Sequence, residues 1–150
     1  MPILCEIVTQ ERLVYSDEVD MVVLNGIEGQ MGILPNHAPL LTTLQIGELR
    51  IKKGNDEEVF SVGGGVLDVR PDKLTILADA AEGAEEIDLA RAEAARTRAD
   101  EFLAEGPKET IPADTYHEIT LALQRANVRL RIGRKRRGRP SPMEFGGSEN

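Results

Sequence analysis

The chain has 150 residues, which suits one medium-sized domain or a small domain with an appendage. Its formal net charge of −8 argues against a general nucleic-acid-binding protein, and the absence of Trp predicts an aliphatic core. The single cysteine, Cys5, excludes an internal disulfide framework and a cysteine-based zinc site. Residues 1–15 do not have the pattern of a signal peptide, and no apolar run approaches the roughly 20 residues of a membrane span. We therefore expect a soluble, intracellular protein.

Apolar and polar residues alternate from Pro2 to about Asp79, which is typical of strands with one buried and one exposed face. Three short strands are expected at residues 3–9, 12–15 and 18–25. Turn residues at 54–56 and 71–72 predict hairpins between later strands. Many short strands without a helical period predict an antiparallel sandwich or barrel of about 80 residues.

The hydrophobic period becomes helical after Gly83. One helix is expected at residues 85–104, ending at a Gly-Pro pair. Thr115 and Glu118 have the spacing of a capping box and predict a second helix that runs to about Ile132. The short loop between the helices predicts an antiparallel hairpin.

The last residues are basic and then rich in Gly, Pro and Ser, and we expect them to be disordered. The sequence is thus divided into a sandwich domain at 1–84, a helical hairpin at 85–133 and a basic tail at 134–150. The many arginines between Arg125 and Arg139 leave open the alternative that the chain binds nucleic acid, although no aromatic residues lie between them to stack on bases.

Three features of the sandwich region allow a chemical or a structural interpretation. His37 has a side chain that can act as a general base, but no nucleophile or acid is nearby in sequence, and a histidine that fixes a turn is favoured. Cys5 is better explained as a small buried apolar residue. The glycines of the segment 62–69 lead into a strand instead of a helix, so a bulge or a close backbone approach is favoured over a phosphate loop.

Arginines recur on both predicted helices. Asp88 and Arg91 are neighbours on the first helix, Arg98 falls near the same edge, and Arg125 and Arg129 lie on the second helix. The plain interpretation is a set of solvated salt bridges of little energetic value. The alternative is a polyphosphate site, because four guanidiniums exceed what one carboxylate neutralises.

The chain resembles the epsilon subunit of bacterial F-type ATP synthase across roughly residues 3 to 133. The resemblance is carried by the segment 26–42 (GIEGQMGILPNHAPLLT), by VGGGVLDV at 62–69 and by the alanine-rich hairpin. It implies a β-sandwich of about ten antiparallel strands followed by an antiparallel two-helix hairpin. It also implies a non-catalytic subunit of the central stalk of a proton-translocating enzyme, which couples gamma to the c ring.

The resemblance further implies regulation by ATP, which is bound and not turned over, with no metal required. Some members of the family bind ATP on the folded hairpin and inhibit ATP hydrolysis when the hairpin extends toward the alpha and beta catalytic subunits. The matching positions here are Glu82, Ile87, Asp88, Arg91, Ala92, Arg98, Arg125 and Arg129.

The same resemblance places Glu28, Gln30, Met31 and His37 against partner subunits, at the c-ring or gamma end of the sandwich. It implies a peripheral position on the cytoplasmic face of the cell membrane, with no membrane span and no nucleic-acid partner. Two alternatives stay open beside it: a purely structural stalk subunit with a vestigial ATP motif, and a hydrolase that uses His37.

Overall fold

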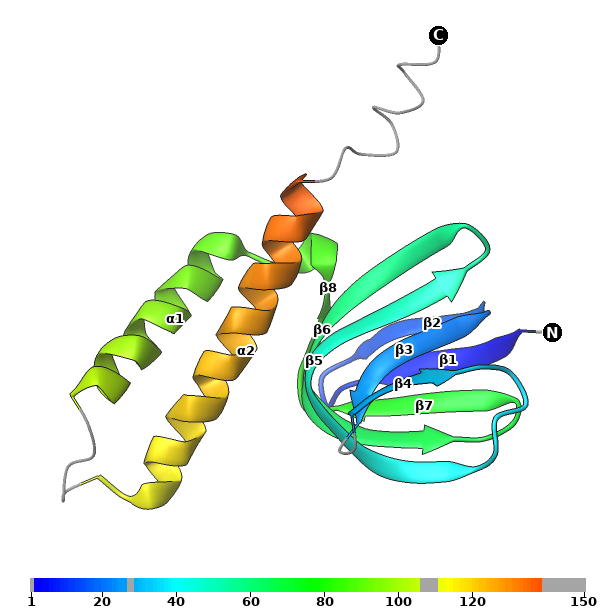
Figure 1. Cartoon of the computed structure of the whole chain (residues 1–150), viewed down its shortest axis with the longest axis horizontal. Coiled ribbons are helices and arrows are strands. Elements are labelled where there is room, and N and C mark those ends of the chain that lie inside the picture. The colour runs from blue at the N-terminus through cyan, green and yellow to red at the C-terminus, as the bar shows by residue number, and fades with distance from the viewer. Residues whose placement is uncertain (1, 27–28, 106–110, 139–150) are drawn as a thin grey trace, which may run out of the picture.

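The computed structural model describes residues 2–26, 29–105 and 111–138, which form a β-sandwich followed by two helices (Figure 1). The predicted order of a sandwich and then a helical hairpin is confirmed. Eight strands lie within the described residues, and seven of them are ordered β2-β1-β7-β6-β5-β3-β4, while β8 pairs with β6. Their bounds are β1 Ile3–Val8, β2 Leu13–Val19, β3 Met21–Gly26, β4 Gly29–Ile33, β5 Leu40–Lys53, β6 Asp56–Val69, β7 Lys73–Ala78 and β8 Ala81–Gly83.

The expectation of about ten strands, all antiparallel, needs two corrections. β5 and β6 are 14 residues each. β6 pairs first with β8 and then with β7, so it is one long strand in a region where two short strands were expected. β1 runs parallel to β7, with Cys5 beside Leu74. Alternation along a strand shows which face of that strand is buried. It does not reveal whether a neighbouring strand about 70 residues away in the sequence runs parallel or antiparallel to it.

The sandwich encloses an aliphatic core, as predicted from the composition. On β1 the residues Ile3, Cys5 and Ile7 are fully buried and alternate with more exposed neighbours. Phe60 joins this core and makes an edge-on contact with Tyr15, with ring centroids 5.4 Å apart. Burial, with a smaller contribution from Glu6, raises the pKa of the Cys5 thiol to about 12. The interpretation of Cys5 as a small buried apolar residue is therefore confirmed.

The glycine run on β6 marks a close backbone approach, as the sequence indicates. Gly64 and Gly65 have positive φ values of 99° and 150°. The amide of Gly63 donates to the carbonyl of Ala80 at 2.7 Å, and the amide of Asp79 donates to that of Gly64 at 2.8 Å. β6 changes its partner from β8 to β7 at this point, and the glycines allow the bend.

His37 lies in the turn that follows β4. Asn36, with φ of 64°, donates its amide to the carbonyl of Pro71 at 2.9 Å, and the His37 amide donates to that of Leu34 at 3.2 Å. The Nδ1 atom of His37 lies 2.7 Å from the carbonyl oxygen of Ala38. The ring is therefore part of a hydrogen-bonded turn, which supports the structural interpretation.

The helical region begins with the 3₁₀ helix η1 (Ala84–Glu86), followed by α1 (Leu89–Ala104) and α2 (Ala113–Gly138). The expected helix start at residue 85 is wrong, because Asp88 caps α1 and only Leu89 begins it. The end near Ala104 is confirmed, and the Gly-Pro pair after it lies outside the described residues.

The predicted capping box of the second helix is also wrong. The amides of Thr115 and Tyr116 both donate to the carbonyl of Pro112, so Thr115 lies within the first turn of a helix that begins at Ala113. α2 continues to Gly138 instead of ending near Ile132, which corrects the expected disorder from residue 134. Lys and Arg are good helix formers and are favourable at the negative end of the helix dipole. Residues 139–150 of the expected tail lie outside the described part of the chain.

The helices pack as an antiparallel pair with α2 between α1 and the sandwich (Figure 1). At the junction with the sandwich, Ile87, Val128 and Ile132 form a small buried cluster against Ile46 and Val59 of β5 and β6. Small residues bring the helices together, since Ala92, Ala99 and Ala126 are all buried. The hairpin is therefore docked on the sandwich by apolar contact.

Candidate functional site

The motif at the start of α1 begins with a helix cap. The carboxylate of Asp88 accepts a hydrogen bond from the backbone amide of Arg91 at 3.1 Å, and the carbonyl of Asp88 accepts one from Ala92 at 3.0 Å. The bond recorded between Asp88 and Arg91 is therefore a helix cap to the Arg91 backbone, which differs from the side-chain pair expected from the spacing. A carboxylate here also complements the positive end of the helix dipole.

Two other motif residues are packing residues in this structure. Ile87 is 8% exposed and belongs to the cluster with Val128 and Ile132, while Ala92 is fully buried. Both lie beside the capped end of α1, so this end of the helix has a fixed position against α2. Any ligand held by Asp88 and Arg91 would therefore meet a preformed backbone.

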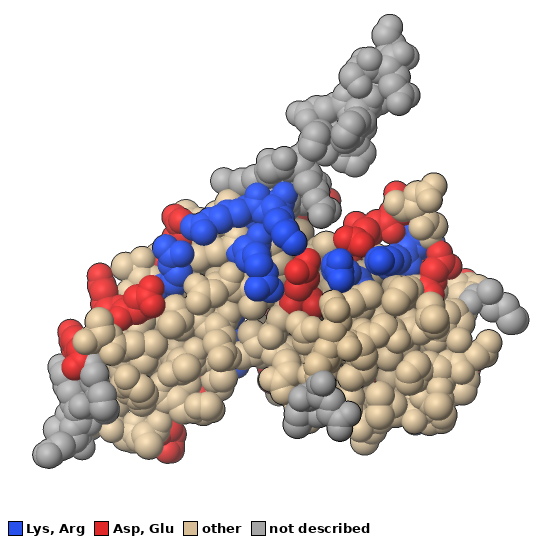
Figure 2. All heavy atoms as spheres, in the orientation of Figure 1, with Lys and Arg blue, Asp and Glu red and all other residues tan. Residues whose placement is uncertain are grey.

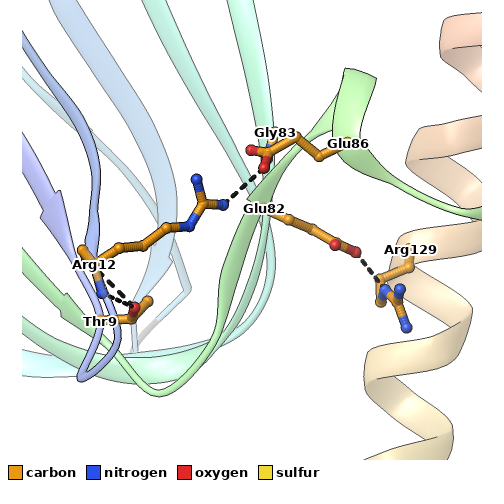
Figure 3. Close-up of polar contacts among 6 residues, drawn as sticks. All are labelled: Thr9, Arg12, Glu82, Gly83, Glu86 and Arg129. Atoms are coloured by element: carbon orange, nitrogen blue, oxygen red, sulfur yellow. Dashed lines mark hydrogen bonds and ion pairs between the residues drawn. The ribbon is translucent and has the colours of Figure 1, made fainter.

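The two motif arginines of α2 contact the sandwich. The Nε of Arg125 donates to the carbonyl of Gly63 on β6 at 3.5 Å, and the Nε of Arg129 donates to the Glu82 carboxylate on β8 at 2.5 Å (Figure 3). The side chains of Arg129 and Glu82 are 24% and 27% exposed, so their ion pair is largely shielded from solvent. The expected set is therefore only partly assembled: Arg125 and Arg129 hold the hairpin to the sandwich, whereas Arg91 and Arg98 are exposed on α1.

Further ion pairs, which the sequence analysis missed, tie the same region together. Glu86 accepts from the Gly83 amide at 3.1 Å and pairs with Arg12 of the β1–β2 loop at 2.7 Å (Figure 3). The backbone bond from Gly83, followed by Arg12, holds the pKa of Glu86 below its ordinary value. Arg134 pairs with Glu93 at 2.7 Å and links α2 to α1. Sequence spacing gives no signal for pairs 74 and 41 residues apart.

Charged side chains are unevenly distributed over the surface. On the face shown in Figure 2, basic groups with acidic groups beside them gather along the upper edge, over the helices and the adjoining part of the sandwich, and the lower part of that face is mostly uncharged. The side chains of the Arg12–Glu86 and Arg134–Glu93 pairs are about half exposed. On this face the charged side chains are therefore concentrated on the helices and the part of the sandwich beside them.

The residues expected to touch partner subunits occupy the β3–β4 hairpin and the turn after it. Gln30 is exposed on β4, and Met31 is partly buried against the sandwich core. His37 lies in the turn described above. Glu28 lies outside the described residues.

An exposed apolar row crosses three strands near these residues and was missed by the sequence analysis. Leu41 on β5, Val66 on β6 and Leu77 on β7 are 72%, 40% and 51% exposed. Val66 is paired with Leu77, and Leu41 lies opposite Asp68, two positions along β6 from Val66. A 570 Å³ hollow borders the row and is lined by Leu40, Leu41, Val69 and Pro71 among others. Consecutive apolar residues at 40–41, 66–67 and 76–77 were the available signal, since strict alternation would place a polar residue on the outer face.

No helix in the described ranges is long and apolar enough to cross a membrane. Within the same residues, no group of three or more His, Cys, Asp or Glu side chains is arranged to hold a metal ion.

Comparisons with known proteins agree with this architecture. Residues 3–84 match the family model of the ATP synthase delta/epsilon chain beta-sandwich domain, and residues 85–133 match that of its long alpha-helix domain. An ATP synthase epsilon chain of Dehalococcoides mccartyi is 52% identical over 135 residues, covering 90% of this chain and 94% of the relative. One from Herpetosiphon aurantiacus is 46% identical over 139 residues, covering 93% and 99%.

Two solved structures share the fold at low sequence identity. A chain of the Euglena gracilis mitochondrial ATP synthase has a TM-score of 0.70 at 22% identity, covering 84% of this chain and 78% of that one. A chain from the central stalk and c ring of the Tetrahymena thermophila mitochondrial enzyme has a TM-score of 0.59 at 14% identity, covering 89% and 97%. Together, the two family models and the close relatives show that this chain belongs to the family of ATP synthase epsilon chains.

Proposed function

We propose that the chain is a central-stalk subunit of a proton-translocating F-type ATP synthase, that it couples gamma to the c ring, and that its hairpin restrains ATP hydrolysis in response to ATP. Support for the stalk position comes from its family and from the stalk and c-ring assembly in which one structural neighbour was solved. In this role the subunit performs no chemistry, and it is a peripheral component on the cytoplasmic face of the cell membrane.

The sandwich supplies the surface for the stalk partners. The apolar row formed by Leu41, Val66 and Leu77 is exposed to solvent in the isolated chain. An exposed apolar patch of this kind is typical of a surface that binds another protein. Its outer position on β5, β6 and β7 fits burial against a second stalk subunit, for which gamma is the proposed partner. Gln30 and Met31 on the β3–β4 hairpin are proposed to face the c ring.

The observation that carries the regulatory proposal is the docking of α2 on the sandwich through two motif arginines. Arg125 reaches Gly63 on β6, and Arg129 reaches Glu82 on β8, so the groups proposed to bind ATP are the groups that hold the hairpin closed. A polyphosphate bound by these guanidiniums and by the capped end of α1 would bridge both helices. Occupancy of the site is thereby coupled to the position of the hairpin.

Linkage gives the size of the effect. ATP that binds only the closed hairpin stabilises it by RT ln(1 + [ATP]/Kd), about 2.7 kcal/mol at 100 times Kd. When ATP is scarce the hairpin opens, and the buried faces of Ile87, Val128 and Ile132 then need another surface to cover them. In the proposed extended state, gamma and the alpha and beta subunits provide that surface, and hydrolysis is blocked.

Calorimetric titration of ATP into the full chain tests the sensor. We expect one-to-one binding with a Kd between about 1 μM and 1 mM, weakened in Asp88→Ala and Arg125→Ala variants. Arg70→Ala, which removes an exposed arginine just after β6 that pairs with Asp68, is the matched control and leaves binding unchanged. Absence of binding up to millimolar ATP would refute the sensor and leave the stalk assignment intact.

A structural subunit without ATP sensing is the second candidate, and one observation favours it. Arg125 and Arg129 both contact the sandwich, which gives each arginine a structural role that needs no nucleotide. This candidate predicts that Arg125→Ala loosens the hairpin while no variant of the chain responds to ATP. The same titration, with hydrogen exchange of α2 measured with and without ATP, separates the two.

A further inference from the structure

Gly133 is buried inside α2, where this helix packs against the start of α1. Glycine is the least favourable residue of a helix interior apart from proline, so its presence here calls for a structural reason. We propose that Gly133 is a positioning residue: it leaves the space in which Leu89 packs, and it thereby favours the closed hairpin over the extended one. This inference rests on the two hairpin states of the proposed function and does not depend on ATP binding.

Two side chains at the start of α1 fill the space beside Gly133. A Cβ atom on residue 133 would lie 2.6 Å from Cδ2 and 3.3 Å from Cγ of Leu89, and 3.2 Å from Cγ2 of Ile87. All three distances are shorter than an ordinary carbon–carbon contact, and rotating only the end of the Leu89 side chain would leave its Cγ too close. Ile87 is buried and, being β-branched, has few alternative rotamers. A side chain at position 133 therefore requires the start of α1 to move away from α2.

The backbone of α2 is held in place on both sides of Gly133. Ile132 is 2% exposed and packs with Ile87 in the cluster at the sandwich. Arg134 pairs with Glu93 of α1 at 2.7 Å. These contacts flank residue 133 directly, so α2 cannot shift to make room for a side chain without disturbing one of them. The strain of a larger residue would thus fall on the contact between α1 and α2.

The two hairpin states use Gly133 differently. In the closed hairpin it permits the contact with Leu89, which packs against the cluster at the sandwich. In the proposed extended state α1 has left α2, so this contact is lost and alanine would suit the helix better than glycine. The low helix propensity of glycine is common to both states, whereas its benefit belongs to the closed state alone. Gly133→Ala should therefore shift the equilibrium toward the extended hairpin.

Hydrogen exchange of the free full-length chain tests the contact. Gly133→Ala should speed exchange at the start of α1 by at least about fivefold, because overpacking destabilises a well-packed site. Exchange in the paired strands β5 and β6 should stay unchanged. Asn127→Ala is the matched control: it also raises the helix propensity of α2, but Asn127 is exposed, so this variant should not speed exchange. Unchanged exchange in Gly133→Ala would overturn the inference, and so would equal acceleration by Asn127→Ala.

A double variant identifies the neighbour that Gly133 accommodates. Leu89→Ala removes the Cγ and Cδ2 atoms that a methyl group at position 133 would meet. Adding Gly133→Ala to Leu89→Ala should therefore speed exchange little beyond the effect of Leu89→Ala alone. Fully additive effects of the two substitutions would overturn the role of Leu89.

ATP hydrolysis by the assembled ATP synthase distinguishes positioning from simple damage to the hairpin. With Gly133→Ala in place of the wild-type chain, hydrolysis should fall, by up to about fivefold for a fivefold shift toward the extended state. A damaged hairpin would instead release hydrolysis, so a rise would overturn the positioning role. Faster exchange in the free chain with unchanged hydrolysis would contradict the proposed restraint of hydrolysis, and it would leave the contact between Gly133 and Leu89 standing.

Discussion

Gly65 and Leu77 approach each other so closely across β6 and β7 that a Cβ atom on residue 65 would lie 2.2 Å from the carbonyl oxygen of Leu77. The obstacle is backbone and cannot rotate away. Gly65 also has a positive φ of 150°, which side-chain-bearing residues rarely adopt. This contact fixes the bend at which β6 passes from β8 to β7.

Gly65→Ala is therefore expected to destabilise the sandwich by about 3 kcal/mol or more, since strain and steric overlap add. Gly54→Ala is the matched control: Gly54 has a positive φ of 61° but open space around its Cα, so only the conformational cost of about 1 kcal/mol applies. Thermal or urea unfolding measures both. Equal losses in the two variants would show that φ alone, without the Leu77 contact, explains the glycine.

The cap on α1 predicts a difference between two substitutions of Asp88. Asp88→Ala loses the bond to the Arg91 amide and should cost about 1 kcal/mol of hairpin stability, whereas Asp88→Asn keeps a good cap and should cost little. Hydrogen exchange in the first turn of α1 measures this directly. The same two variants also help to interpret the ATP titration. Asp88→Asn keeps the helix cap, so weaker ATP binding by this variant would be caused by the lost negative charge and not by an uncapped helix.

The depressed pKa of Glu86 gives the hairpin junction a pH dependence of known sign. A carboxyl whose pKa is lower in the folded than in the unfolded protein contributes stability above its unfolded pKa, for which the ordinary value is 4.5, and that contribution is lost as pH falls through the folded value. The melting temperature of the wild type should therefore exceed that of Glu86→Gln at pH 7. The gap should shrink as pH falls below 4.5. A gap that widens toward acid would contradict the assignment.

The apolar row predicts a loss of assembly without a loss of folding. Leu41→Glu and Leu77→Glu place charges on a face that is exposed in the free chain, so the thermal stability of the isolated protein should change by less than about 0.5 kcal/mol. Binding to the other stalk subunits should fall by at least tenfold in a reconstitution or pull-down assay. Leu13→Glu, on β2 and 55% exposed, is the control that should assemble normally. Normal assembly by all three variants would remove the row from the proposed interface.

Local chemistry explains why much of this fold is predictable. Alternating residues such as Leu49 and Ile51 identified the buried faces of strands, and the glycines from Gly63 onward indicated a close approach that the structure contains. The helix starts were predicted less well. Asp88 is as good a cap as residues nearer Gly83, and Pro112 offers a carbonyl that competes with the Thr115 capping box. Several local signals of similar strength then compete, and tertiary packing decides among them.

The candidate site was harder to predict than the fold. Its residues on α1 follow one another in the sequence, so their spacing reveals a shared end of a helix. The partners of Arg125 and Arg129 are 62 and 47 residues away on β6 and β8, and nothing in the helical pattern identifies Gly63 or Glu82 as those partners. The register between α2 and the sandwich follows from the packing of Val128 and Ile132, which only the assembled structure contains.

One strand, β6, joins the proposed stalk interface to the proposed nucleotide site. On β6, the apolar row at Val66 and the carbonyl of Gly63 that receives Arg125 are three residues apart, about 10 Å of extended chain. Along this stretch β6 is paired with β5 at Gly63, Gly65 and Val66, and it bends at the glycines where its other partner changes from β8 to β7. If a stalk partner binds at Val66 as proposed, a force on the sandwich there would act within a few residues of the carbonyl that anchors α2.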